Sequence, residues 1–388
     1  MVEERDIVCV STTDWDEVWG SRQQIASTLA RRYRVIYVER QVGPEHLARY
    51  PNLRGRWRRG DVSERAGVTL LRPPLLGPGR FFSRLVDDFS QHRLASWLRG
   101  HLARLGVTRP ILWLYPPNSH LLPRLLPNAV SLYHCIDRFA GQSTGRKARV
   151  LRAEEADTLK AVDACLAYSR AIAVDHSRIQ SRTVYWPNGC DFSRIRSLFA
   201  VAGPEPEDLA RIPHPRLGHM GSVAGKTDLG LVDRLSRERP EWQLVFVGNE
   251  YPHDLDMERW TMMKARPNVH FLGPKPIADV PLYEKGFDLC LVLWQVNAWT
   301  RELQPIKIFE YLATGRPIVS MRLPELVDLA AAIRFADSTD DFLAACSSAL
   351  EARESVAESG QLALAETYSW ENRLKEAVTK LRALGLEI

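Results

Sequence analysis

A strand–helix–strand pattern at the start of the chain constrains its fold more than any other feature. Residues 6–11 form an apolar, β-branched run that predicts a buried strand, and residues 35–38 predict a second one. Between them, residues 21–32 place Ile25 and Leu29 on one helical face. Short joints between the three segments indicate a βαβ unit, whose strands pair in parallel. Further strands are predicted at 111–114, 130–133, 164–168 and 183–186, with a helix over 150–163.

The alternation restarts after residues 201–215, which are rich in proline and polar side chains and predict a linker. Strands are predicted beyond it at 216–221, 244–247, 269–272, 289–294 and 318–321, with a helix over 229–237. The length of 388 residues suits two or three domains. We therefore predict an α/β protein with two Rossmann-like, doubly wound parallel-sheet domains and a binding cleft between them. We predict a first domain over 1–200, a linker over 201–215 and a second domain over 216–365. A last helix over 366–388 is expected to cross back to the first domain.

Several common sites are absent from the sequence. No G-x-G-x-x-G follows the first strand of either half, and there is no GxxxxGK[ST], so a dinucleotide-dependent dehydrogenase and a P-loop NTPase are not favoured. With no HExxH and no close His/Cys cluster, we predict no metal and no cofactor besides the substrate itself. The six cysteines are scattered and indicate reduced thiols. No apolar run is long enough to span a membrane, and residues 1–11 do not resemble a signal peptide, so we expect a cytoplasmic protein.

The positive charge is concentrated between residues 49 and 109. This stretch holds 13 arginines and four acids, a local charge of +9, whereas the whole chain carries +5. Such a patch suits anionic lipid head groups or an anionic substrate, and a solvated arginine-rich surface is the alternative. Because no nucleic-acid motif or repeated aromatic pattern accompanies it, we predict no nucleic-acid partner. Peripheral contact with the inner face of a membrane through 49–109 remains open.

The most informative segment spans residues 287–320. A predicted strand ends near Trp294, and Pro305 stands where a helix can begin. A helix N-terminus attracts phosphate oxygens, Lys307 adds a full positive charge in the first turn, and the Glu310 carboxylate can accept hydrogen bonds from ribose hydroxyls. Glu302 precedes this helix and can reach a sugar attached to the diphosphate. The pattern suits a nucleotide diphosphate.

This segment resembles the family 4 glycosyltransferases, which are retaining enzymes with the GT-B fold. Glu302 and Glu310 have the Glu-x7-Glu spacing of these enzymes, 187–191 (PNGCD) resembles their P-N-G-V-D, and 218–225 (GHMGSVAG) resembles their glycine-rich first loop of the C-terminal domain. The similarity covers most of the chain, is weakest over 45–105, and is greatest to a bacterial branch that assembles cell-surface polysaccharides.

The resemblance implies a metal-independent transfer of a sugar from a nucleotide-diphospho-sugar to a hydroxyl. The donor-binding residues that it implies are Gly221, Ser222, Lys226, Gly248, Gln304, Pro305, Lys307 and Glu310. The catalytic candidates are Glu302, which orients the donor sugar, Lys226, which neutralises the departing diphosphate, and Asp137, as acceptor contact or base. A buried capping role is the alternative for Asp137.

The acceptor is expected on the N-terminal half. Aromatic faces stack on sugar rings and carboxylates bind hydroxyls, and both residue types crowd the loop after the first strand. The acceptor-binding candidates are Asp14, Trp15, Asp16, Trp19, Arg22 and, at a later strand end, His134. The acids of this loop can instead serve the start of the following helix.

Two other functions remain open at this point. A nucleotide-sugar 2-epimerase would keep the fold and the donor site but need no acceptor. A basic module that binds membrane or nucleic acid would use the arginine-rich stretch without catalysis.

Overall fold

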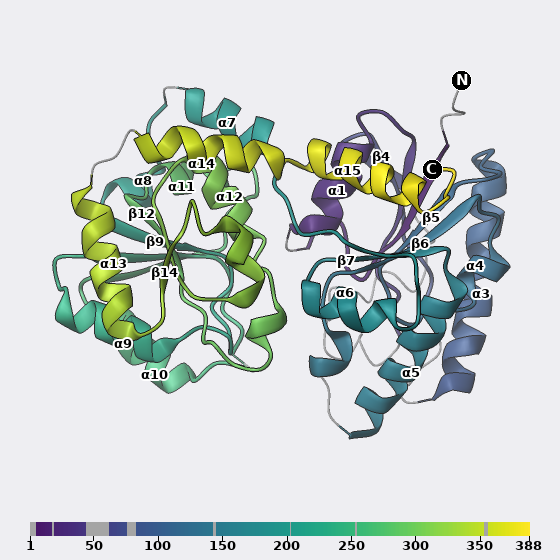
Figure 1. The fold of residues 1–388 in the computed structure, drawn as a ribbon, viewed down its shortest axis with the longest axis horizontal. Coiled ribbons are helices and arrows are strands. Elements are labelled where there is room, and N and C mark those ends of the chain that lie inside the picture. Colours follow the sequence, from purple (N-terminus) through teal and green to yellow (C-terminus); the bar gives the residue numbers. More distant parts are fainter. Residues whose placement is uncertain are drawn as a thin grey trace. The chain divides into compact units, whose positions relative to one another are not determined.

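The computed structural model describes residues 5–17, 19–43, 62–75, 83–142, 145–201, 203–252, 254–352 and 356–388. It consists of two compact units (Figure 1): Met1–Pro187 with Arg373–Ile388, and Asn188–Asn372. Each unit is a largely parallel sheet with helices packed on it, which confirms the predicted α/β class with two Rossmann-like domains. In the described part of the chain, no helix combines the length and apolar character needed to cross a bilayer.

The first unit contains an eight-stranded sheet in the order β3-β4-β2-β1-β5-β6-β7-β8. Its strands are β1 (Ile7–Val10), β2 (Val35–Val38), β3 (Val62–Arg65), β4 (Val68–Leu71), β5 (Ile111–Leu114), β6 (Val130–Cys135), β7 (Ala164–Ala167) and β8 (Thr183–Tyr185). Its helices are α1 (Ser21–Leu29), α3 (Arg84–Arg104), α4 (Leu122–Leu125), α5 (Gly145–Ala161) and α6 (Arg170–Ser177), with a 3₁₀ turn η2 (Phe139–Gln142). All pairings are parallel except β3 with β4.

The β3–β4 hairpin was not predicted from the sequence. It lies inside the arginine-rich stretch, and β3 is exposed along its whole length, so it lacks the apolar pattern that marks a buried strand. Its turn is made by Ala66 and Gly67, both with positive φ. Of the thirteen arginines of this stretch, six lie outside the described residues: Arg49, Arg54, Arg56, Arg58, Arg59 and Arg80.

The second unit contains a six-stranded sheet in the order β11-β10-β9-β12-β13-β14. Its strands are β9 (Arg216–Met220), β10 (Gln243–Val247), β11 (Val269–Gly273), β12 (Leu289–Val292), β13 (Ile318–Met321) and β14 (Arg334–Ala336). Its helices are α7 (Phe192–Ala200), α8 (Glu207–Ala210), α9 (Leu229–Glu238), α10 (Met257–Lys264), α11 (Val280–Lys285), α12 (Lys307–Thr314), α13 (Thr339–Glu351) and α14 (Val356–Thr367), with 3₁₀ turns η3 (Thr300–Glu302) and η4 (Pro324–Leu329). Figure 1 shows α9, α10 and α13 on one side of this sheet and α7, α11, α12 and α14 on the other.

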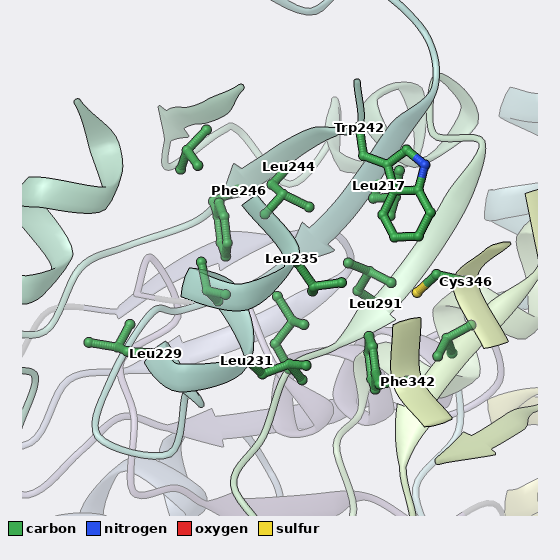
Figure 2. Packing of buried hydrophobic residues seen from close by; sticks show 14 of the residues in the cluster. Leu217, Leu229, Leu231, Leu235, Trp242, Leu244, Phe246, Leu291, Phe342 and Cys346 are labelled. Carbon is green, nitrogen blue, oxygen red and sulfur yellow. The ribbon is translucent and has the colours of Figure 1, made fainter. Parts of the chain in front are cut away.

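Helix α9 explains how one face of the second sheet is covered. Its leucines recur at helical spacing, and Figure 2 shows Leu231 and Leu235 facing the strand residues Leu217 and Leu291. Phe342 of α13 packs into the same cluster. These side chains are almost completely buried, so the apolar periodicity of α9 corresponds to a real core face.

The division between the units differs from the predicted boundary at residue 200. The chain enters the second unit at Asn188 because α7 packs on α11 and α12. The predicted linker 201–215 is also part of this unit: it contains α8, and Leu209 and Ile212 are buried. Proline and polar residues suggested an exposed connection there, but two apolar side chains anchor it.

The last helix, α15 (Trp370–Ala383), begins in the second unit, and the first unit resumes at Arg373. Within the first unit, the Trp186 indole N–H donates to the Arg373 carbonyl at 2.7 Å, and Lys380 Nζ donates to the Tyr185 carbonyl at 3.4 Å. The C-terminal segment is therefore attached beside the end of β8.

Gly218, in the middle of β9, permits close packing of the second core. A Cβ at this position would lie 2.1 Å from the ring of Phe287, which is buried. We expect Gly218→Ala to lower the free energy of unfolding of the second unit by about 1–3 kcal/mol, because overpacking forces ring or backbone shifts. Thermal unfolding followed by circular dichroism would measure the loss.

Gly100→Ala is the matched control. It lies on α3, where a Cβ meets only the end of the Arg104 side chain at 3.9 Å. A helical glycine-to-alanine change should leave the melting temperature unchanged or raise it. Equal melting temperatures for the Gly218 variant and the parent would show that the core relaxes without cost.

Candidate functional site

The loops after β9 and β12 meet where the order of the second sheet reverses. The strand order runs outward in both directions from the neighbouring strands β9 and β12, and ligands of such sheets bind outside this switch point. The two loops are held together by an isolated bridge between Thr227 and Trp294, and by a hydrogen bond from Gln295 N to the Lys226 carbonyl at 2.9 Å. These contacts place Lys226 beside the switch point.

Lys307 lies at the start of α12, and its ammonium group is buried. Its Nζ is 3.0 Å from Nε2 of His219, which lies near the end of β9. The Nδ1 of His219 is 3.2 Å from the Leu291 carbonyl, an acceptor only, so Nδ1 carries the proton and Nε2 accepts from Lys307. Tyr311, one turn further, accepts a hydrogen bond from Met220 N at 2.7 Å. Helix α12 is therefore fixed on β9 through polar contacts.

The electrostatics of this pair favour a negatively charged ligand. Burial, and then the nearby charge of Lys226, hold the pKa of Lys307 well below its usual 10.5, while Glu310 and Glu284 act in the opposite direction. Burial and the charge of Lys307 likewise hold the pKa of His219 well below 6.5. A phosphate group beside Lys307 would reverse the first of these shifts, because it stabilises the ammonium form.

Trp294 joins the two lysines. The Nζ of Lys226 lies 4.3 Å and the Nζ of Lys307 6.0 Å from the centre of its ring. The indole N–H of Trp294 is buried and has no hydrogen-bond partner among the described residues. The two lysine side chains and the buried indole N–H therefore lie close together. This arrangement costs free energy unless an anion accepts their hydrogen bonds.

Gly221 and Gly248 allow the backbone to approach this group closely. Gly221 has a φ of +99°, and a Cβ there would lie 3.1 Å from Lys307 Nζ. Gly248 has a φ of +150°, and a Cβ there would lie 2.3 Å from the Gly221 carbonyl oxygen. Any side chain at either position would therefore be strained: at 221 it would enter the space beside Lys307, and at 248 it would collide with the backbone of Gly221. Ser222 follows directly and is half-buried.

The predicted residues of the 302–310 segment fall into two groups. Glu310 is half-buried and lies three residues after Lys307, so both share one face of α12. Glu302 is half-buried at the end of η3, ahead of Pro305. Gln304 is different: its Oε1 accepts from Asn188 N at 2.8 Å and its Nε2 donates to the Glu325 carbonyl at 3.2 Å. The fold itself uses both ends of this amide.

In the first unit, two of the predicted acceptor residues are used by the fold. Trp15 is buried, with its ring edge-on to Tyr37 at 5.1 Å, so its face is not open to a sugar. Asp14 is buried and pairs with Arg40 at 3.3 Å. By contrast, Asp16 is exposed and Trp19 is half-buried, which leaves surface for a ligand.

Arg22 and His134 lie at the carboxyl edge of the first sheet. The Nε of Arg22 donates to Thr13 Oγ1 at 3.0 Å. Burial, reinforced by the charge of Arg22, lowers the pKa of His134 to about 3, so this ring is neutral at physiological pH. Asp137, just beyond β6, is half-buried and its charge raises the pKa of Arg22 against the effect of burial. These three predicted residues are therefore brought into one electrostatic neighbourhood.

The fold brings together two groups of side chains that could hold a metal ion, neither of which the sequence spacing suggested. They are Cys135, Glu155 and His176, and Asp87, Asp88 and His120. In the first group, the Tyr133 hydroxyl donates to Glu155 at 2.7 Å. In the second, Asp87 accepts from Asn118 and from Gln91, each at 2.6 Å. Protein donors already serve the carboxylates of both groups.

Sequence reasoning missed His219 as the partner of Lys307 and Trp294 as the surface between the two lysines. The sequence placed His219 within the glycine-rich segment 218–225 and Trp294 at the end of a strand, but gave neither a role at the lysines. The contacts that give them one join segments about 70–90 residues apart in the chain. A histidine in the strand before a glycine-rich loop was the only available signal.

Comparison with known proteins identifies a matching family and a bacterial relative. Residues 229–379 match the family described as glycosyl transferase-like. The chain is 25% identical over 287 residues to the provisionally named teichuronic acid biosynthesis glycosyltransferase TuaH of Bacillus subtilis (strain 168), covering 69% of this chain and 71% of that protein.

Solved structures show the same fold along nearly the whole chain. Sucrose-phosphate synthase from Thermosynechococcus elongatus has a TM-score of 0.66 at 15% identity, covering 98% of this chain and 99% of the other. The E. coli trehalose-6-phosphate structure bound with UDP-2-fluoro glucose has a TM-score of 0.68 at 12% identity, covering 97% and 98%.

The family match and the bacterial relative point to the same activity, and the solved structures share the two-unit fold. Together they identify this chain as a glycosyltransferase with the GT-B fold.

Proposed function

We propose that this glycosyltransferase moves a sugar from a nucleotide-diphospho-sugar, held by the second unit, to a hydroxyl of an acceptor held by the first. The observation that carries the proposal is the buried Lys307, together with Lys226 and the unpaired indole N–H of Trp294. A diphosphate is the ligand that supplies what this group lacks, because its oxygens accept hydrogen bonds and carry negative charge. The E. coli neighbour was solved with a UDP-sugar, so UDP-sugars are the first donors to test.

The other residues of the donor site then take defined roles. Gly221, Ser222 and Gly248 admit the diphosphate and the nucleobase close to the backbone, and the Glu310 carboxylate accepts hydrogen bonds from the ribose hydroxyls. Glu302 orients the donor sugar. The Glu-x7-Glu spacing supports retention of the anomeric configuration.

The transfer itself breaks the bond between the anomeric carbon and the diphosphate oxygen, and forms one from that carbon to the acceptor hydroxyl oxygen. The bonding electrons leave with the nucleoside diphosphate, whose charge Lys226 and Lys307 stabilise. The hydroxyl proton goes to a base, for which Asp137 is the candidate. The TuaH relative is named for teichuronic acid biosynthesis, which supports a bacterial surface glycan or its lipid-linked precursor as the acceptor.

Lys307→Met should separate binding from folding. Removing a buried ammonium relieves a desolvation cost, so the melting temperature without ligand should be unchanged or higher. With the best of UDP-, GDP-, dTDP- and ADP-glucose, however, the ligand-induced rise in melting temperature should disappear, and kcat/KM should fall roughly 100-fold. The exposed Lys160, changed to Met, is the charge-matched control. A full ligand-induced rise in the Lys307 variant would overturn the donor site.

The same lysine predicts a pH dependence. Because burial depresses the pKa of Lys307, the free site loses its positive charge as pH rises through that depressed value, whereas a bound diphosphate favours the ammonium form. Donor affinity should therefore weaken with rising pH, and binding should take up a proton. Calorimetry in buffers of different ionisation enthalpy measures that uptake, which should vanish in Lys307→Met.

Conversion of the nucleotide sugar into a different nucleotide sugar without any acceptor would instead indicate an epimerase.

We also propose that no metal takes part, because two lysines and the N-terminus of α12 provide the positive charge that a divalent cation would otherwise supply. Dialysis against EDTA should leave the rate of sugar transfer unchanged, and added Mg²⁺ or Mn²⁺ should not raise it. A loss of rate that Mg²⁺ restores would contradict this part of the mechanism.

Helix α3 supports the proposed contact with an anionic membrane. Its Leu85 is 82% and its Phe89 60% exposed, one turn apart, and the exposed Arg93 lies over the Phe89 ring at 6.0 Å. Arg99 and Arg104 continue the exposed basic side. Apolar side chains beside arginines suit an interface of acyl chains and anionic head groups.

Vesicle flotation tests this contact. We expect binding to phosphatidylglycerol vesicles but not to phosphatidylcholine vesicles. The double variant Leu85→Ser, Phe89→Ser should bind at least roughly 100-fold more weakly, because each of the two apolar side chains contributes about 1.5–3 kcal/mol when buried. Val174→Ser, at another exposed apolar position of the first unit, is the control. Equal flotation of both variants would remove α3 from the membrane contact.

A further inference from the structure

The carboxyl edge of the first sheet holds three side chains with donor groups for which the described residues provide no acceptor. Arg22 is the second residue of α1, and its one hydrogen bond in the described structure is the Nε contact with Thr13 at 3.0 Å. Both of its terminal amino groups remain for a ligand. A half-buried guanidinium with unused nitrogens in the first turn of a helix is a strong anion-binding element.

Tyr115 provides the second donor. It follows β5 directly, with its backbone N–H bonded to the Val10 carbonyl at 3.0 Å, so it stands at the same edge as the loop after β1. Its side chain is completely buried, yet its hydroxyl has no hydrogen-bond partner among the described residues. A buried hydroxyl left unpaired costs free energy, which a ligand oxygen would recover.

His134 provides the third donor. Its ring centre lies 5.1 Å from that of Tyr115. The Trp113 indole N–H, which can only donate, lies 3.3 Å from Nδ1 of His134, so the proton of this neutral ring is on Nε2. In the described part of the chain, no residue accepts a hydrogen bond from that Nε2–H.

The carboxylates around this group do not neutralise it. Asp14 and Glu17 both pair with Arg40, and Asp137 influences Arg22 electrostatically without a hydrogen bond to it. A neutral sugar hydroxyl would satisfy one donor but leave the terminal amino groups of Arg22 without a directly bonded anion, since Asp137 and Glu17 act on Arg22 only through space. A carboxylate or a phosphate has only acceptor oxygens, so one such group can serve all three donors.

We propose that the acceptor carries an anionic group, a carboxylate or a phosphate, which Arg22 binds with the help of the Tyr115 hydroxyl and the His134 Nε2–H. This inference rests on the proposed function in taking the acceptor to the first unit. Trp19, half-buried and three residues before Arg22, offers its ring to the sugar that bears the anion.

The test uses the full-length chain and three probes that differ only at C6: methyl glucoside, methyl glucuronide and methyl glucoside 6-phosphate. Saturation-transfer NMR titration should give an affinity for one anionic probe at least roughly tenfold above that for methyl glucoside, as a charge-assisted hydrogen bond allows. The stronger of the two anions identifies the source as a uronic acid or a sugar phosphate.

Variants connect the effect to the named residues. Arg22→Gln should abolish the preference for the anion. Tyr115→Phe should weaken the preference severalfold, because it removes the donating hydroxyl. Arg22→Lys should retain part of the preference even if the glutamine variant folds poorly. Arg32→Gln is the matched control, since it removes an exposed charge just beyond the same helix. Equal affinity for all three probes, or loss of the preference in both Arg22→Gln and Arg32→Gln, would overturn the proposal.

Nucleotide-sugar binding separates this inference from the proposed function. Arg22→Gln should leave the affinity for the nucleotide sugar unchanged, because we place the nucleotide-sugar site on the second unit and Arg22 lies on the first. If the parent protein binds no nucleotide sugar, the proposed function fails, whereas the anion preference at Arg22 is measured independently of that result.

Discussion

A buried ammonium group organises the functional end of the second unit. Lys307 donates to His219, an internal strand residue, and this contact attaches the start of α12 to β9. Its burial is tolerable because two acids and an imidazole partly compensate the charge, and because only glycine stands at positions 221 and 248. Lys226 adds a second positive charge beside the Trp294 ring, and the buried indole N–H of Trp294 has no hydrogen-bond partner among the described residues. This is the physical basis on which we propose that the site binds an anion, the diphosphate of the donor.

The first unit repeats the same principle with different residues. At its sheet edge lie a guanidinium, a phenol and an imidazole, each with at least one donor that has no acceptor among the described residues. In both units, parallel strands end at one edge, so side chains from distant segments converge there without any local sequence signature. The two edges differ in one respect: the second unit presents compact ammonium charges on lysines, whereas the first presents the planar, multi-donor guanidinium of an arginine.

The sequence predicted much of this arrangement where periodicity was strong. Strands β2 and β5 were placed to the residue, and the leucines of α9 marked a true core face. The β3–β4 hairpin was missed because its exposed strand has no apolar pattern, and residues 201–215 were taken for a free linker although Leu209 and Ile212 are buried. Among site residues, Trp15 was expected to stack on a sugar, but its ring packs against Tyr37. The residue types of a loop do not show which of its tryptophan rings is buried in the core and which remains accessible.

By itself, the sequence determined the two-domain α/β class and the placement of Lys307 and Glu310 on one helical face, because both follow from local periodicity and spacing. Only the tertiary structure decided which polar groups lack partners. Gln304, a predicted ligand contact, uses its side-chain amide in hydrogen bonds with Asn188 and Glu325. By contrast, the Tyr115 hydroxyl and the Trp294 indole N–H have no hydrogen-bond partner among the described residues. Hydrogen-bond satisfaction depends on atoms supplied by other strands and loops, so it cannot be deduced from the residue's own neighbours in the chain.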